Sequence, residues 1–213
     1  MNTLPWIEYV RFVITLVAVL DPFLAIPMFL AVTGQQSPAG RRRAAGLVAA
    51  TVLAVLIGAA VTGDALLELM GASLPSFRVG GGIVLLMMAL AMLNAQTGNI
   101  RQTSQEADEL EQRTTVGIVP LAIPILAGPG AISTVILFAQ QGGWAHRAVI
   151  LGCILAVCGL LWVMLRVATR LGRALGVSGL NVANRLLGLL LTGIAVETMA
   201  AGLKQLFPVL GGT

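Results

Sequence analysis

Long stretches without any charged residue dominate this sequence. Residues 44–63, 79–100 and 148–165 contain no Asp, Glu, Lys or Arg, and residues 114–145 form a run of 32 such positions. A helix that crosses a bilayer needs about 20 mostly apolar residues. Two further apolar stretches, one near each end of the chain, contain isolated charges. We therefore predict six membrane spans, in the ranges 6–33, 44–63, 79–100, 114–145, 148–165 and 180–206.

The overall composition excludes a soluble domain. Hydrophobic residues make up 57% of the chain and charged residues 10%, and the mean hydropathy is +0.93. Soluble domains carry about 25% charged residues, so this much apolar surface requires lipid as its solvent. The net charge of +4 does not indicate a nucleic-acid partner, because the basic residues lie between the apolar runs. The N-terminal segment lacks a basic region and a small-residue cleavage site, so we interpret it as a first span.

The arginines between the predicted spans fall mainly on one side of the membrane. Cytoplasmic loops of membrane proteins carry an excess of Lys and Arg. Eight arginines share one side, namely Arg41, Arg42, Arg43, Arg101, Arg113, Arg166, Arg170 and Arg173. Arg11, Arg147 and Lys204 fall on the other side. We therefore predict a multi-pass protein of the cell (plasma or inner) membrane, with both termini outside the cytoplasm.

Two sequence motifs occur twice. "PFLAIP" at 22–27 and "PILAGP" at 124–129 are offset by 102 residues, and an Arg-x-x-Gly motif begins at Arg78 and again at Arg185. An odd number of spans in each repeat gives the two repeats opposite orientations, as in many secondary transporters. We predict an all-α, polytopic membrane fold with six helices in a 3+3 inverted-topology repeat. The single transmembrane domain, 1–213, then comprises a first repeat at 1–96, a cytoplasmic linker at 97–115 and a second repeat at 116–213.

The paired prolines predict that the first and fourth helices are broken near mid-membrane. Proline removes a helical hydrogen bond and clashes with the preceding turn. A break exposes carbonyls on one side and a helix N-terminus on the other, which attract cations and anions respectively. An alternative is that the prolines only kink the helices for packing. The candidate substrate-binding residues are Asp21, Pro22, Ile26, Pro27, Pro124, Gly128, Pro129, Gly130, Ala131, Ser133 and Thr134.

Asp21 is the most informative of these residues. An acidic group in mid-membrane is costly and normally marks a path for an ion or a substrate. The alternative is a structural N-cap for the helix that begins at Pro22. A zwitterionic amino acid would place its amine toward Asp21 and its carboxylate toward the N–H groups around Gly128. For Ser133 and Thr134, a local hydrogen bond to the carbonyl four residues earlier is an equally good explanation.

Three further charged residues are candidates for gating or coupling. Arg78 and Arg185 lie near the starts of the third and sixth spans, so they are expected near opposite faces of the membrane, where they could hold two gates closed. Glu197 lies 12 residues beyond Arg185, and a buried carboxylate there could carry a coupling proton or ion, or it could cap a neighbouring broken helix. The alternative for both arginines is that their side chains reach to the membrane interface.

Four blocks of the sequence are distinctive, namely "DPFLAIPMFLAVT", "AIPILAGPGAIST", "FRVGGGIVLLMMAL" and "RLLGLLLTGIAVE". They resemble blocks of the MarC family of membrane proteins, within the LysE-type transporter superfamily. The resemblance covers essentially the whole chain. It implies secondary transport of small neutral amino acids such as glycine and alanine.

Other functions have weaker support in the sequence. There is one histidine, and there is no Gly-x-Ser-x-Gly, metal-ligand cluster or phosphate-binding loop, so we expect neither an enzyme nor a metal or cofactor site. Energy would come from exchange or from a gradient, with H⁺ or Na⁺ as the coupling ion. The expected partners are the lipid bilayer and the substrate, and an oligomer is compatible with the sequence. The alternatives are a non-transporting scaffold, a channel and, least of all, an intramembrane enzyme.

Overall fold

The computed structural model describes residues 5–34, 36–94 and 127–211. Within these ranges the chain forms helices and short turns and contains no strand. The elements are α1 (Pro5–Leu20), α2 (Pro22–Thr33), α3 (Pro38–Met70), α4 (Leu74–Leu93), α8 (Pro129–Ala139), α9 (Trp144–Arg166), α10 (Ala168–Leu206) and the short 3-10 helix η1 (Pro208–Gly211). The prediction of an all-helical fold is therefore confirmed for the described residues.

Five stretches in the described ranges are long and apolar enough to cross a membrane. They are Trp6–Thr33, Pro38–Gly63, Leu74–Leu93, Trp144–Arg166 and Ser178–Leu206. The helix α8 is apolar but has 11 residues, which is too short to span a bilayer alone. The predicted fourth span, 114–145, begins outside the described residues, so α8 represents its second part.

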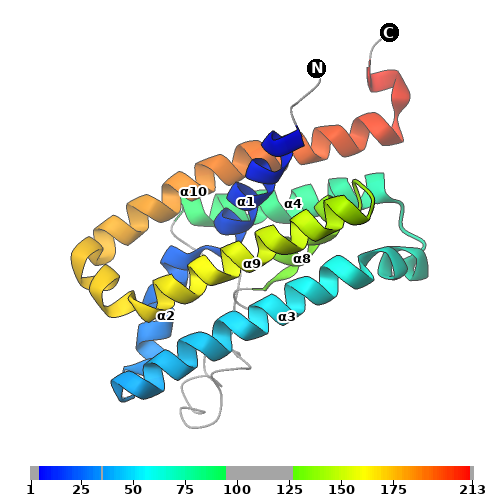
Figure 1. Ribbon diagram of the computed structural model, residues 1–213. Helices are drawn as coiled ribbons and strands as arrows, with labels where there is room; N and C mark the ends of the chain where they lie inside the picture. The colour runs from blue at the N-terminus through cyan, green and yellow to red at the C-terminus, as the bar shows by residue number, and fades with distance from the viewer. Residues whose placement is uncertain (1–4, 35, 95–126, 212–213) are drawn as a thin grey trace.

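The helices α3, α4, α9 and α10 lie side by side, with their ends gathered in two groups (Figure 1). The two termini, the α3–α4 connection and the α8–α9 turn lie at one end, which we call the terminal end. The α2–α3 and α9–α10 connections lie at the opposite end. The arginines at 41–43 and at 166–173 belong to this second end, so the grouping of loops follows the predicted charge asymmetry.

Proline marks the start of several helices. Pro22, Pro38 and Pro129 each occupy the first turn of a helix, where the missing N–H has no intrahelical partner to lose. The residue before Pro38 is Ser37, whose hydroxyl accepts a hydrogen bond from the Gly40 N–H at 3.2 Å. A capping serine or aspartate followed by proline therefore sets the starts of α2 and α3 locally, whereas Gly128 precedes Pro129 at the start of α8 without a side-chain cap.

The helices α4 and α10 run antiparallel and pack along much of their length. Glycines make this close approach possible. A Cβ on Gly202 would lie 2.8 Å from the Pro75 carbonyl oxygen, and one on Gly188 would lie 2.8 Å from the Met92 Cβ. Small residues at such contacts let two membrane helices approach closely.

Three consecutive glycines in α4 face three different surroundings. A Cβ on Gly82 would lie 3.0 Å from the Ala195 carbonyl oxygen of α10, whereas one on Gly81 would lie 3.3 Å from Leu137 of α8. A Cβ on Gly80 would meet nothing within 4 Å. The triplet therefore lets α4 pack against α8 and α10 at the same level.

Arg41 links three helices at the end opposite the termini. Its guanidinium donates to the Thr169 hydroxyl of α10 at 2.8 Å and to the Thr33 and Gly34 carbonyls at the C-terminal end of α2 at 3.2 and 3.3 Å. A cation at the C-terminal end of α2 also interacts favourably with the helix dipole. The ends of α2, α3 and α10 are thereby fixed to one another.

Candidate functional site

The first membrane span is broken at a single residue, Asp21. Its backbone is left-handed, with φ 48° and ψ 68°, and Asp21 is the one non-glycine residue with positive φ in the described part of the chain. The flanking hydrogen bonds continue: the Asp21 N–H donates to Val17, and the Asp21 carbonyl accepts from Ala25. The carboxylate accepts the Leu24 N–H at 3.2 Å. Asp21 is thus an N-cap, and its side chain is fully buried.

The break differs from the prediction in its extent. The two prolines were expected to unwind the chain between them. Pro22 begins α2, whereas Pro27 stays inside this helix and is exposed. A membrane helix tolerates an internal proline where neighbouring groups satisfy the backbone. Of the two prolines only Pro22 belongs to the break, and the buried Ile26 packs toward the start of α10.

Asn184 of α10 contacts the Asp21 carboxylate. The orientation of its amide is assigned from its hydrogen-bonding options. With the amide nitrogen toward Asp21, Asn184 donates to Oδ2 at 2.7 Å and to Oδ1 at 3.3 Å. Its side chain is 6% exposed, so the sixth predicted span is fixed to the break in the first. Asn184 was not among the candidate site residues from the sequence, although an amide in an apolar span is itself a signal of helix contact.

The start of α8 lies next to the first break. Gly128 is the N-cap, and its carbonyl accepts from the N–H groups of Ala131 and Ile132 at 3.0 and 3.2 Å. Gly130 and Ala131 are buried, while Pro129 is exposed. A Cβ on Gly130 would lie 3.3 Å from Val19, two residues before Asp21. The predicted candidates on α8 therefore meet the end of α1, and Pro124 lies outside the described residues.

The hydroxyls of α8 are used locally. Ser133 and Thr134 both donate to the Gly130 carbonyl, at 3.1 and 2.7 Å. Both side chains are buried. Both hydroxyl protons are therefore used in local hydrogen bonds, as the alternative from the sequence expected. Only the oxygen lone pairs of Ser133 and Thr134 remain for a ligand.

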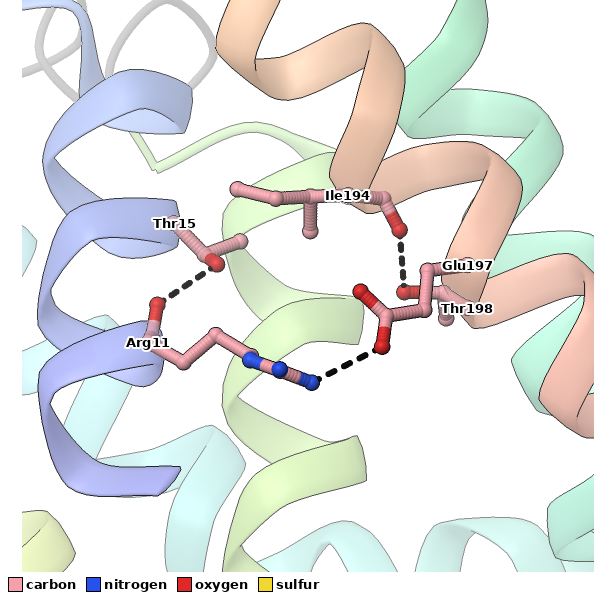
Figure 2. Close-up of polar contacts among 5 residues, drawn as sticks. All are labelled: Arg11, Thr15, Ile194, Glu197 and Thr198. Atoms are coloured by element: carbon pink, nitrogen blue, oxygen red, sulfur yellow. Dashed lines mark hydrogen bonds and ion pairs between the residues drawn. The ribbon is translucent and has the colours of Figure 1, made fainter. Parts of the chain in front are cut away.

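A separate cavity of about 190 Å³ opens between α1, α4, α8 and α10. Its lining includes four charged residues, Glu8, Arg11, Arg78 and Glu197, together with Thr15 and Thr134. We call it the charged cavity. Arg11 Nη1 lies 2.9 Å from Glu197 Oε1 (Figure 2). Two of the predicted gating residues, Arg78 and Glu197, are therefore brought together, at the terminal end.

Glu197 differs from its predicted setting. A buried carboxylate was expected at Glu197, whereas its side chain is 63% exposed and pairs with Arg11. The reason is that Glu197 faces the charged cavity. Arg185 is exposed and does not line this cavity. Within the described residues, no group of three or more His, Cys, Asp or Glu side chains is placed to hold a metal ion.

Together these features define a multi-pass α-helical integral membrane protein with an interrupted first span and a buried carboxylate at the interruption. Residues 6–207 match the family model for "MarC family integral membrane protein". The chain belongs to this family.

Relatives extend over nearly the whole chain. It is 35% identical to "UPF0056 membrane protein YhcE" of Escherichia coli (strain K12), covering 94% of each chain. It is 34% identical to "UPF0056 membrane protein YvbG" of Bacillus subtilis (strain 168), covering 92% of this chain and 94% of the relative. These names state a membrane location and no activity. No solved structure matches the chain.

Replacing Asn184 by alanine is expected to destabilise the fold. Asn184→Ala removes the amide from a buried carboxylate, and a hydrogen bond to a charged group contributes about 1.5–3 kcal/mol. The exposed Asn181, one turn earlier on the same helix, provides the matched control Asn181→Ala. Thermal unfolding of both variants in detergent measures the difference, and equal melting temperatures would contradict the assigned contact.

Proposed function

We propose that the chain is a secondary transporter that moves small neutral amino acids such as glycine and alanine across the cytoplasmic membrane. The observation that carries this proposal is the fully buried Asp21 carboxylate, held by the Leu24 N–H and the Asn184 amide beside the start of α8. A carboxylate at mid-depth is costly and is characteristic of ion and substrate paths. Asp21 lies ~22 Å along from Trp6 and ~18 Å before Thr33, at about 1.5 Å per helical residue.

The proposed architecture is six spans in a 3+3 inverted repeat, with the fourth span completed by residues before α8. Packing of equivalent helices supports it: α3 packs against α9, and α4 packs against α10. The contact between α2 and α10 also has a counterpart in that between α4 and α8. The concentration of arginines opposite the terminal end supports an orientation with both termini outside the cytoplasm.

A bound amino acid would bridge the two breaks. Its ammonium group is placed at Asp21, and its carboxylate at the N-terminus of α8, where the helix dipole favours an anion. A Cβ on Gly130 would lie 3.3 Å from Val19, which is two residues before Asp21. One small ligand could therefore reach both Asp21 and Gly130. The coupling ion, H⁺ or Na⁺, would use the same carboxylate.

The site is expected to select substrates by size. Gly128 is half-buried at the N-cap of α8, and its lack of a Cβ allows a carboxylate to approach the backbone. Gly128→Ala is expected to reduce alanine uptake several-fold more than glycine uptake, because the added methyl competes first with the larger substrate. Uptake of both substrates at matched concentrations measures this. An equal decline together with a lower melting temperature would indicate that Gly128 serves packing only.

Uptake by proteoliposomes tests the proposed function directly. Radiolabelled glycine and alanine are expected to enter in a saturable manner, and unlabelled alanine should compete while leucine should not. Imposed proton and sodium gradients identify the coupling ion. A scaffold would give no uptake above protein-free liposomes, and a channel would give uptake that does not saturate. Either result would overturn the proposal.

A further inference from the structure

The charged cavity holds equal numbers of positive and negative side chains. Glu8 and Glu197 face it together with Arg11 and Arg78, and its volume is about 190 Å³. At ~30 Å³ per water molecule, this is room for roughly six waters. The cavity is therefore too small for a drug-sized ligand, whose pockets measure about 300–1,000 Å³. Its balanced charge suits a small ligand that carries both charges and no net charge.

The hydroxyls around the Arg11–Glu197 pair are already engaged by the backbone (Figure 2). Thr15 donates to the Arg11 carbonyl at 2.7 Å, and Thr198 donates to the Ile194 carbonyl at 2.8 Å. Thr134 donates to the carbonyl of Gly130. Recognition of a ligand in the cavity must therefore come mainly from the four charged side chains.

The ion pair between Arg11 and Glu197 is easily opened. A single contact of 2.9 Å joins Nη1 to Oε1, and the side chains are 48% and 63% exposed. An exposed pair of this kind contributes about 0–1 kcal/mol. A guanidinium can bind a carboxylate through two parallel hydrogen bonds, which is the stronger arrangement. Arg11 thus has more donor capacity than Glu197 uses.

The wall of the cavity includes residues close to the first break and to the start of α8. Thr15, in its wall, is six residues before Asp21, or ~9 Å along α1. Thr134, also in the wall, lies one turn beyond Gly130. A ligand in the cavity would therefore be held one to two helical turns from the Asp21 break, on the terminal side of it.

We propose that the charged cavity is a second binding site, which takes one small zwitterionic amino acid before it reaches Asp21. The ligand inserts between Arg11 and Glu197, with its carboxylate on the guanidinium and its ammonium group on the carboxylate. One ion pair opens and two form, so each charged side chain keeps a partner. This inference rests on the proposed transport function and adds an entry site to it.

Transport kinetics provide the first test. Arg11→Gln and Glu197→Gln are each expected to raise the KM for alanine about tenfold or more, the size expected from losing one charged contact, with little change in maximal rate. The exchanged pair Arg11→Glu with Glu197→Arg should recover part of the affinity. Glu68→Gln and Lys204→Gln change exposed charges outside the cavity lining and should leave KM unchanged. An unaltered KM in both single variants would overturn the inference.

Labelling of a cavity cysteine provides a test that does not depend on transport. In full-length protein with Cys153→Ala and Cys158→Ala, Thr198→Cys places a thiol in the cavity, and Ala200→Cys places one on the exposed side of the same helix. Alanine should slow labelling of the first thiol and not of the second, while leucine should protect neither. Ile194→Cys replaces Thr198→Cys if that variant does not fold. Lack of protection by alanine refutes the cavity site, whereas protection without uptake by the parent protein refutes the transport function.

Discussion

Uptake of glycine and alanine is expected to fall about 10- to 100-fold in Asp21→Asn, the loss expected for removal of one contact to a charged group. Asparagine keeps the side-chain oxygen that caps the Leu24 N–H, and it adopts left-handed backbone conformations at least as readily as aspartate does. The Asn184 amide can turn its oxygen toward the new amide nitrogen. The break therefore survives while the negative charge is lost.

Two controls separate charge from structure in this experiment. Asp21→Ala removes the cap and leaves a residue without a local hydrogen bond at positive φ, so its melting temperature should fall clearly below that of Asp21→Asn. Glu68→Gln removes an exposed carboxylate of α3 and should leave uptake intact. If Asp21→Asn lost stability in proportion to uptake, Asp21 would be a structural cap and not a substrate or ion ligand.

Gly202→Ala is expected to disrupt the packing of α4 against α10. The new methyl would lie 2.8 Å from the Pro75 carbonyl oxygen and 2.8 Å from Val79 Cγ2, and the backbone oxygen cannot move without shifting the start of α4. Overpacking of this kind costs about 1–3 kcal/mol. We expect a lower melting temperature in detergent and a less monodisperse protein.

Glycines on the same two helices supply the matched controls. A Cβ on Gly193 of α10 or on Gly80 of α4 would meet nothing within 4 Å. Gly193→Ala and Gly80→Ala should therefore keep or raise the melting temperature, since alanine is the better helix former. Equal effects of Gly202→Ala and Gly193→Ala would mean that close helix approach is not what Gly202 provides.

The sequence predicted those features that depend on local composition. Apolar runs placed the five spans found in the described residues, and Asp21 before Pro22 placed the first break, because capping and proline geometry act within one turn. The prediction that Pro27 takes part in the break was wrong, since tolerance of an internal proline depends on neighbouring helices. The prediction that the Glu197 carboxylate is buried was wrong for a similar reason, because the exposure of Glu197 depends on a cavity built by four helices.

The contacts across the candidate site could not be predicted. Asn184 meets Asp21, and Arg11 meets Glu197, over large separations in the sequence. Spacing along a helix determines which face a residue occupies, but it does not determine which distant helix that face will contact. Only the packed arrangement brings these pairs together.

The left-handed backbone of Asp21 has a consequence for motion. The helices α1 and α2 join through one pair of backbone torsions, and such a conformation at a non-glycine residue costs on the order of 1–3 kcal/mol. The oxygens that hold it in place, through Leu24 and Asn184, are the same atoms that a cationic group would bind. Occupancy of the carboxylate and the angle between the two helices are therefore thermodynamically linked. A ligand that binds these oxygens changes the preferred angle between α1 and α2. A change in this angle alters the affinity for the ligand by the same free energy.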